Sequence, residues 1–253
     1  MATALITGAS AGLGAEFARQ LAARGDDLVL VARSAEALER LGAELAAAHG
    51  VRVEVLPADL TDSGGIARVA GRLASPAAPI GLLVNNAGYG LGLDFEANDV
   101  ETEAAHLRIH VETPIRLSHA AYRAMLARGG GRVANVASVA GFIPRGTYGA
   151  AKAFLISFSR WANAVYGSCG VTTTAVCPGF THTTFHERMG LPPGQEGVPP
   201  WMWLDAGEVV RVALRDIDRG RAVSVPSLRY KVLVALTRVV PARLAARVGT
   251  RGR

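Results

Sequence analysis

Lysine is nearly absent from this chain, which takes its positive charge almost wholly from arginine. Of the 27 basic residues, only Lys152 and Lys231 are lysines. Cysteine is also scarce, because Cys169 and Cys177 are the only two and they are not in a Cys-x-x-Cys arrangement. Two lone thiols argue against a disulfide framework and favour a reducing compartment, so we expect a cytoplasmic protein.

Long apolar runs and an N-terminal group of cations are missing as well. The first basic residue is Arg19, so the start of the chain does not resemble a secretion signal. No apolar stretch reaches the roughly 18 residues that a membrane-spanning helix needs. The net charge of +6 comes from residues 226–253, which contain six Arg, one Lys and no acidic residue. The remainder is close to neutral, which argues against a nucleic-acid-binding face.

Runs rich in Val, Ile and Leu alternate with helical patterns along the chain. The apolar runs predict strands over residues 2–8, 27–33, 51–60, 80–88, 131–141, 170–179 and 220–227. The helical patterns cover residues 13–25, 34–50, 62–73, 98–127 and 147–167. This alternation predicts an α/β fold with a doubly wound parallel sheet and helices on both faces. We expect one domain over residues 1–227, a Pro- and Gly-rich lid at 180–205, and a basic helical C-terminal tail over 228–253.

The glycine-rich segment TGASAGLG, residues 7–14, lies between the first predicted strand and the first helix. Such a turn lets the backbone approach a diphosphate and aims the free N–H groups of a helix N-terminus at it. Arg33 follows the second strand, where an acidic residue would bind the 2′-hydroxyl of NAD and an arginine accommodates the 2′-phosphate of NADP. NADP(H) is therefore favoured over NAD(H), which the same site could also take. A plain turn and a solvated arginine remain the alternatives.

Tyr148 and Lys152 are four residues apart and lie one above the other on a predicted helix. A nearby ammonium favours the phenolate, so it lowers the pKa of the tyrosine toward the range of an acid–base catalyst. In a chain that otherwise uses arginine, a lysine here indicates a role that arginine does not fill. The alternative is a surface lysine beside a packed tyrosine.

Five motifs occur together in one order: TGASAGLG, NNAG at 85–88, Ser138, Tyr148-x-x-x-Lys152, and PGFTHT at 178–183. In this combination the chain resembles the short-chain dehydrogenase/reductase family over residues 2–227. The resemblance implies a seven-stranded Rossmann-type sheet. It also implies hydride transfer between NAD(P)(H) and a ketone, aldehyde or alcohol. A homodimer or homotetramer formed through the fourth and fifth helices is a further implication.

The resemblance also implies roles for individual residues. Tyr148 acts as general acid and base, Ser138 hydrogen-bonds the substrate oxygen, and Lys152 lowers the pKa of Tyr148 and holds the nicotinamide ribose. The implied cofactor-binding set is Gly8, Ser10, Gly12, Leu13, Gly14, Arg33, Asp59, Leu60, Asn86, Ala87, Gly88, Tyr148, Lys152, Pro178, Gly179, Thr181 and Thr183.

Two positions depart from the family pattern. His110 stands where the family usually has an asparagine that helps to hold a water in a proton relay. A neutral histidine could serve in that relay, or it could be a buried packing residue. Ser138 and Tyr148 are ten residues apart rather than about thirteen, which shortens the loop around residues 142–146. These departures motivate an alternative function, a nucleotide-binding regulator of the same fold with weak or no catalysis.

The lid and the tail supply the remaining hypotheses. His182, His186 and Glu187 lack the spacing of a zinc-binding helix, so we predict no metal site. The tail mixes apolar residues with arginine at helical spacing and could lie on an anionic membrane surface, cover a neighbouring subunit, or pack on its own domain.

Aromatic residues are frequent in the loops that should surround the nicotinamide. They predict a small apolar or aromatic carbonyl or alcohol substrate, with ordinary packing as the alternative. These residues are Phe142, Phe180, Phe185, Trp201 and Trp203.

Overall fold

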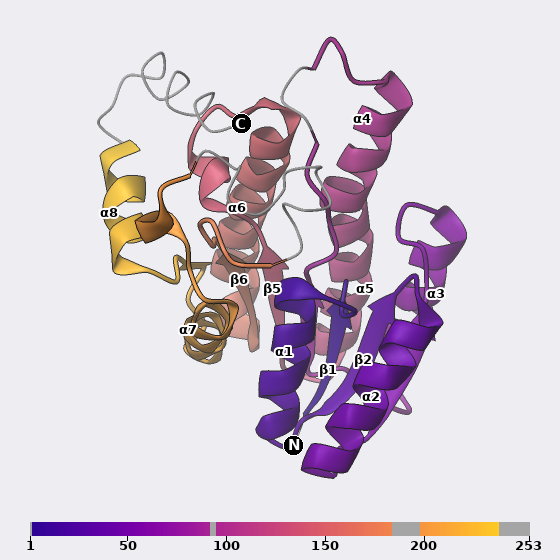
Figure 1. The fold of residues 1–253 in the computed structure, drawn as a ribbon. Coiled ribbons are helices and arrows are strands. Elements are labelled where there is room, and N and C mark those ends of the chain that lie inside the picture. The colour runs from indigo at the N-terminus through magenta and orange to yellow at the C-terminus, as the bar shows by residue number, and fades with distance from the viewer. Residues whose placement is uncertain (1, 92–94, 184–197, 238–253) are drawn as a thin grey trace.

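In the computed structural model, which describes residues 2–91, 95–183 and 198–237, seven parallel strands form one sheet. The strand order is β3-β2-β1-β4-β5-β6-β7, and helices cover both faces (Figure 1). The strands are β1 Thr3–Thr7, β2 Asp27–Ala32, β3 Val53–Pro57, β4 Leu82–Asn85, β5 Gly131–Val136, β6 Val171–Val176 and β7 Val223–Ser224. The predicted doubly wound, Rossmann-type sheet is therefore confirmed.

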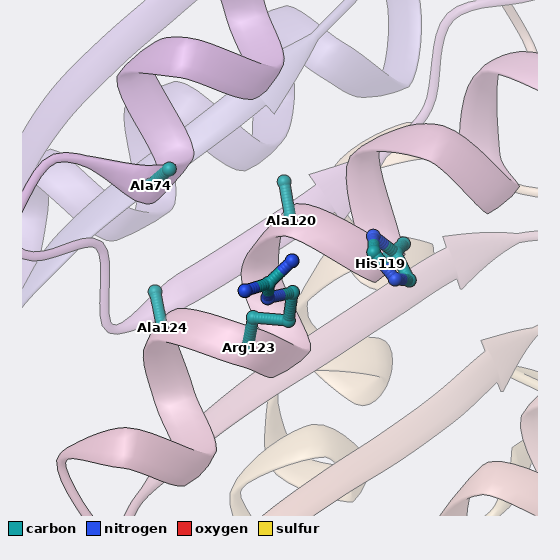
Figure 2. Close-up of a pocket in the computed structure, with 5 residues that line it drawn as sticks. All are labelled: Ala74, His119, Ala120, Arg123 and Ala124. Carbon is teal, nitrogen blue, oxygen red and sulfur yellow. The ribbon is translucent and has the colours of Figure 1, made fainter.

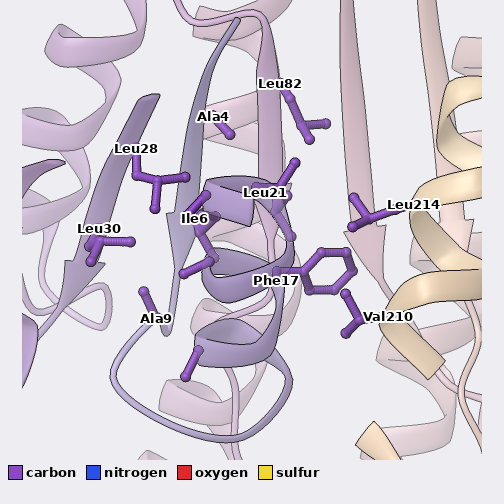
Figure 3. Close-up of a cluster of buried hydrophobic side chains, with 14 of the residues drawn as sticks. Ala4, Ile6, Ala9, Phe17, Leu21, Leu28, Leu30, Leu82, Val210 and Leu214 are labelled. Atoms are coloured by element: carbon purple, nitrogen blue, oxygen red, sulfur yellow. The ribbon is translucent and has the colours of Figure 1, made fainter. Parts of the chain in front are cut away.

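The central strands are buried on both faces because their side chains alternate between two apolar layers, whereas the edge strand β3 is only partly buried. Ala4 and Ile6 of β1 pack on one side with helices α1, Gly12–Ala23, and α2, Ala35–His49. Figure 3 shows Phe17 of α1 beside Val210, which belongs to a later helix on the same face. Leu5 of β1 points to the opposite layer, which contains α3, Ser63–Ala74, and α6, Gly146–Tyr166.

Local capping fixes where the first helices begin and end. Ser34 accepts a hydrogen bond of 3.2 Å from the Ala37 N–H at the start of α2, and Gly50 ends the helix in a left-handed conformation with φ of 68°. Asp62 caps α3 by accepting from the Gly65 N–H at 3.0 Å. These boundaries agree with the sequence prediction.

The predicted long helical stretch over residues 98–127 is confirmed from Val100 onward, with one π turn that was not predicted. Helix α4, Val100–Leu107, continues into a π turn, η1, Arg108–Glu112, and then into α5, Thr113–Ala127. Pro114 gives the physical reason. It has no N–H to donate to the carbonyl four residues earlier, that of His110, and its ring crowds that carbonyl. A widened turn at this point places His110 within a non-α segment.

One helix was not predicted from the sequence, and another covers only part of a predicted segment. Helix α7, Ala206–Asp218, was not predicted, although Asp205 caps it by accepting from the Glu208 N–H at 2.9 Å. The predicted tail is helical over α8, Leu228–Thr237, and its remainder lies outside the described residues. Across the ranges that the structure describes, none of the helices combines the length and the apolar character needed to traverse a bilayer.

The strand order reverses beside β1, which pairs with β2 on one side and β4 on the other. In open parallel sheets, ligands bind outside the carboxyl ends of the strands at such a switch point. The glycine-rich turn after β1 and the NNAG segment after β4 both lie there. The fold therefore places the predicted nucleotide motifs at one edge of the sheet.

Candidate active site

The turn between β1 and α1 has the shape of a diphosphate cradle. Gly8 and Gly12 have φ of +66° and +56°, which favours glycine. A Cβ on Gly14 would lie 2.2 Å from the Gly8 carbonyl oxygen, so no side chain fits where α1 crosses the turn. Ala11 at the helix N-cap offers no side-chain hydrogen bond, and the first turn has no acidic residue. The helix N-terminus is therefore suited to an anion, and the site fits a dinucleotide.

The NNAG segment supports this turn from the neighbouring strand. Thr7 Oγ1 accepts hydrogen bonds from the backbone N–H groups of Asn86 and Ala87, at 2.9 and 3.0 Å. The Asn86 side-chain amide donates to the Thr7 carbonyl at 2.9 Å. A Cβ on Gly88 would lie 2.3 Å from His110 Cε1, so this glycine lets the imidazole approach the backbone. Asn86 and Gly88 thus shape the site as well as lining it.

The ends of β2 and β3 hold the predicted adenosine contacts. Arg33 is exposed directly after β2. Asp59 accepts from the Thr61 hydroxyl at 2.7 Å and from the Thr61 N–H at 2.8 Å. These hydrogen bonds, with a smaller contribution from the Arg33 charge, lower the pKa of Asp59. Leu60 is only 4% exposed and packs in the core, so its side chain points away from solvent.

Ser138 and Tyr148 come together despite the short loop between them. The chain after β5 turns through a 3-10 segment, η2, Val139–Phe142, whose N-cap is Ser138. Ser138 Oγ accepts from the Ala140 N–H at 3.1 Å, and the Ser138 side chain also hydrogen-bonds Tyr148. Tyr148 lies in the first turn of α6, at residues 146–166, so the ten-residue spacing is sufficient for the contact.

Lys152 lies one helical turn beyond Tyr148 and faces the end of β5. Its Nζ donates to the Val136 carbonyl at 2.8 Å and is 5.5 Å from the centre of the Tyr148 ring. Lys152 is 5% exposed, and this burial lowers its pKa from 10.5 to about 7. The structure therefore brings the predicted Ser, Tyr and Lys into one group.

The direction of the Tyr148 pKa shift differs from the prediction that Lys152 lowers it. Burial raises the pKa of Tyr148 to about 12, although the residue is partly exposed. The hydrogen bond from Ser138 and the charge of Arg145 oppose this rise. Desolvation thus exceeds the combined effect of the Ser138 hydrogen bond and the Arg145 charge. Tyr148 keeps its proton near neutral pH and can donate it to a substrate oxygen.

His110 contacts the catalytic group from η1. It is 1% exposed, and its ring meets the Tyr148 ring edge-on with 5.6 Å between centroids. Its Nε2 lies 2.7 Å from the Tyr89 carbonyl oxygen, which can only accept, and 3.3 Å from the Tyr89 N–H, which can only donate. The carbonyl contact is the shorter of the two, so we assign the proton to Nε2. Nδ1 then carries the lone pair and has no hydrogen-bond partner in the described part of the chain. Burial, reinforced by the Lys152 charge, holds the pKa of His110 well below 6.5, so the imidazole is neutral.

Two further residues join this group and were not predicted from the sequence. His106 of α4 lies 4.4 Å from His110 and 6.1 Å from Tyr148, between ring centroids. Tyr89, after β4, meets the His106 ring edge-on at 5.5 Å. The four-residue spacing of His106 and His110 could have signalled a shared helical face. The position of Tyr89 depends on tertiary folding and left no such signal.

The segment after β6 approaches the glycine turn from the other side. The Pro178 carbonyl accepts from the Val139 N–H at 3.0 Å, and Thr181 Oγ1 donates to the Gly179 carbonyl at 3.0 Å. Thr183 Cβ would be 3.4 Å from a Cβ on Gly12, so this residue lies against the diphosphate turn.

Packing against α8 explains why residue 179 is a glycine. A Cβ there would lie 2.0 Å from the Tyr230 ring of α8. The Tyr230 hydroxyl accepts from the Phe180 N–H at 3.1 Å and donates to the Met202 carbonyl at 2.8 Å. Gly179 thus lets α8 fasten the segment after β6. Of two further predicted cofactor residues, Ser10 lies in the turn between β1 and α1, and Leu13 lies in the first turn of α1.

The predicted aromatic group does not form one cluster. Phe180 and Trp203 are 5.8 Å apart between centroids, and His182 stacks on Trp203 at 4.7 Å. Trp201 is 59% exposed, while Phe142 packs beneath Arg160 at 5.9 Å. Phe185, His186 and Glu187 lie outside the described residues.

A surface hollow of about 380 Å³ lies between α3 and α5. Figure 2 shows Arg123, Ala120 and Ala124 of α5 facing Ala74 at the end of α3, and His119 completes the lining. Both helices approach the amino ends of the strands at this point, so the hollow lies away from the edge that carries Tyr148. It is not part of the candidate active site.

Comparison with known proteins decides the family. Residues 2–191 match the family model described as short chain dehydrogenase. The chain belongs to the short-chain dehydrogenase/reductase family. It is therefore an NAD(P)-dependent oxidoreductase, which disfavours the regulator alternative. A curated relative, the galactitol 2-dehydrogenase (L-tagatose-forming) of Cereibacter sphaeroides, is 34% identical over 193 residues, which is 74% of each protein.

Solved structures of short-chain dehydrogenases share the fold over almost the whole chain. A short-chain dehydrogenase from Sphingobium yanoikuyae in complex with NADPH is 35% identical, with a TM-score of 0.86 and 94% coverage of both chains. The bulky-bulky ketone specific alcohol dehydrogenase from Comamonas testosteroni is 32% identical, with a TM-score of 0.81 and coverage of 94% and 93%.

Proposed function

We propose that this enzyme interconverts a ketone or aldehyde and an alcohol with NADP(H), and that Tyr148 is its general acid and base. One observation carries the proposal. The hydrogen-bonded pair of Ser138 and Tyr148, with Lys152 one turn away, lies at the same sheet edge as the glycine turn. A proton donor, an oxygen-binding hydroxyl and a dinucleotide cradle are the parts that this reaction needs.

Tyr148, Ser138 and Lys152 have separate roles in carbonyl reduction. The reduced nicotinamide, when bound, supplies the hydride to the carbonyl carbon. Tyr148 holds its proton near neutral pH and gives it to the carbonyl oxygen, while Ser138 donates a hydrogen bond to the same oxygen as negative charge develops. Lys152 offers positive charge beside the phenolate that remains. In alcohol oxidation the phenolate takes the proton back.

The preference for NADP(H) rests on the end of β2. Arg33 is exposed there, and the chain has no acidic residue until Glu36 of α2. Such an arrangement suits a 2′-phosphate and would leave a 2′-hydroxyl without its usual acidic partner. The Sphingobium relative was solved with NADPH, which supports the same preference. Gly8, Gly12 and Gly14 would hold the diphosphate, and Lys152 would bind the nicotinamide ribose.

For the substrate we propose an apolar or aromatic carbonyl compound. Phe180 and Trp203 lie in contact on the segments that follow β6 and precede α7. The Comamonas relative is specific for bulky-bulky ketones, which favours the same class. The galactitol dehydrogenase relative makes sugar alcohols and ketoses the second class to test.

The proposal is tested by NADPH and NADH oxidation against diaryl ketones, alkyl aryl ketones, aldehydes and ketoses, in wild-type enzyme and Tyr148→Phe. Wild-type enzyme should turn over with NADPH, and Tyr148→Phe should reduce kcat at least about 100-fold while NADPH still binds. Activity that survives in Tyr148→Phe would show that another group donates the proton.

We also propose a homo-oligomer formed through α5 and α6. Ile115 of α5 is 40% exposed, and Trp161 and Val165 of α6 are 51% and 45% exposed. Large apolar side chains on neighbouring helices are typical of a surface that a second subunit covers.

The free thiols of Cys169 and Cys177 agree with a cytoplasmic location.

Peripheral membrane contact through α8 is a second proposal. Leu228, Val232 and Leu236 recur at four-residue spacing and are 77%, 53% and 50% exposed. Arg229 and Lys231 are exposed on the same helix, which contains no acidic residue. An apolar stripe with adjacent cations suits an anionic lipid surface. Co-sedimentation with phosphatidylserine vesicles should fall in Leu228→Ser/Val232→Ser, and equal sedimentation of both proteins would contradict this contact.

A further inference from the structure

The His106 side chain is fully buried, yet it has no hydrogen bond in the described part of the chain that would explain a polar residue at this position. Its exposed fraction is 0%, and neither ring nitrogen has a hydrogen-bond partner among the residues described. Burial lowers the pKa of His106, and the Tyr89 backbone opposes this shift through a contact that falls short of hydrogen-bond geometry. A buried polar group without a partner costs about 1–3 kcal/mol. An apolar side chain would avoid that cost, so packing alone does not explain an imidazole here.

The position of His106 points to the proton chemistry of the site. Its ring lies 4.4 Å from His110, 5.5 Å from Tyr89 and 6.1 Å from Tyr148, between centroids. The ring therefore lies behind His110 on the face of α4 and η1 that meets α6. Positive charge on Lys152 acts on both imidazoles and, with burial, keeps them neutral.

A carboxylate continues the row beyond His106. Glu103 precedes His106 by three residues on α4, is 5% exposed, and interacts with it electrostatically. Glu103 Oε1 accepts from the Asn98 side chain at 2.7 Å, while Oε2 has no partner in the described part of the chain. Asn98 is partly exposed and adjoins exposed Asp99, so solvent lies at that end. The titratable groups thus run from Glu103 through His106 and His110 toward α6.

We propose that His106 is a second relay residue, which with His110 returns protons from the Glu103 end of α4 to Lys152 and Tyr148. This inference rests on the proposed function. His106 acts through His110 and does not touch the substrate.

Each reduction consumes one proton from Tyr148, which the enzyme must replace before the next turnover. The O–H bond of Tyr148 breaks as the O–H bond of the alcohol forms, which leaves one phenolate and one proton to replace. Lys152 gives a proton to the phenolate and regains one from the His110 imidazolium, which thereby returns to its neutral form. No direct hydrogen bond joins Nδ1 of His110 to Lys152 in the described part of the chain, so this transfer crosses a bridging water. His110 in turn is protonated through His106, whose source is solvent at Glu103. One solvent proton enters per alcohol formed, and no electrons move along the row.

The test compares His106→Phe, which keeps an aromatic ring, with His106→Gln, which keeps hydrogen bonding but does not carry a proton. Both should lower kcat for reduction by about tenfold at pH 8 and less at pH 6, where solvent protons are more abundant. KM should stay unchanged, and the solvent deuterium isotope effect on kcat should rise. The exposed His119→Phe on α5 is the matched control and should alter none of these quantities.

Two outcomes would overturn the relay. Unchanged kcat in His106→Phe at every pH would show that the imidazole carries no proton. Full rate in His106→Gln with loss in His106→Phe would show hydrogen-bonded positioning instead. Failure of the proposed function itself is seen separately, because Tyr148→Phe would then retain activity whatever the His106 variants do.

Discussion

The burial of a single residue, Lys152, makes the stability of the fold depend on pH. Its side chain is 5% exposed, and burial brings its pKa down from 10.5 to about 7. Between these values the unfolded chain binds the proton more readily than the folded one. Stability must therefore rise as pH increases from about 7 to about 10.5, and the penalty is fully present below pH 7.

Replacing Lys152→Met should remove this pH dependence, because methionine has no proton to lose. Relative to the variant, the wild-type free energy of unfolding should increase by up to about 4 kcal/mol between pH 7 and pH 10. Denaturant titrations at both pH values measure the difference. Parallel curves for the two proteins would contradict the shifted pKa.

Arg33 should decide the choice of cofactor through its charge. Arg33→Ala should weaken NADPH binding about tenfold, since a charge-assisted hydrogen bond contributes about 1.5–3 kcal/mol, and should leave NADH binding unchanged. Fluorescence titration measures both. Arg40→Ala, at an exposed position of α2, is the matched control. Equal weakening of NADPH and NADH would contradict recognition of the 2′-phosphate.

The sequence predicted the group of Ser138, Tyr148 and Lys152 because its members are close in sequence or belong to one ordered set of motifs. It did not predict Tyr89 or His106, and it gave the wrong direction for the Tyr148 pKa. Burial decides that direction, and burial arises only when η1, β5 and α6 pack together. The roles of these residues stay predictions until they are measured.

Among the elements, the turn between β1 and α1 depends most on the absence of side chains. Gly14→Ala would place a Cβ 2.2 Å from the Gly8 carbonyl, so the backbone must move. Gly71→Ala in α3 is the matched control, because nothing lies within 4 Å of a Cβ there. Gly14→Ala should cost about 1–3 kcal/mol and reduce NADPH binding, while Gly71→Ala should gain about 1 kcal/mol. Unaltered NADPH affinity in Gly14→Ala would contradict the cradle.

Elements were predicted best where capping and apolar period agree. Ser34 and Gly50 mark both ends of α2, whereas the π turn within residues 98–127 depends on Pro114, whose effect on the turn before it was not anticipated. Helix α7 was not predicted, although Asp205 and Glu208 form a capping signal at its start.

The whole molecule is expected to assemble through α5 and α6. Trp161→Arg should place a charge within that interface and shift the mass toward monomer in light scattering at micromolar concentration. Trp201→Arg is the matched control, since Trp201 is similarly exposed, at 59% against 51%, but lies outside both helices. A mass unchanged in Trp161→Arg but lowered in Trp201→Arg would place the interface elsewhere.

The most direct test of the whole account follows the hydrogen that the enzyme transfers. A ketone that the wild-type enzyme reduces is incubated with NADPH deuterated at the reactive nicotinamide carbon, and the alcohol is examined by mass spectrometry and NMR. We predict one deuterium on the carbinol carbon, and labelled alcohol formed at least about 100-fold more slowly by Tyr148→Phe. Solvent hydrogen on that carbon, or labelled alcohol from Tyr148→Phe at the wild-type rate, would contradict hydride transfer with Tyr148 as the proton donor.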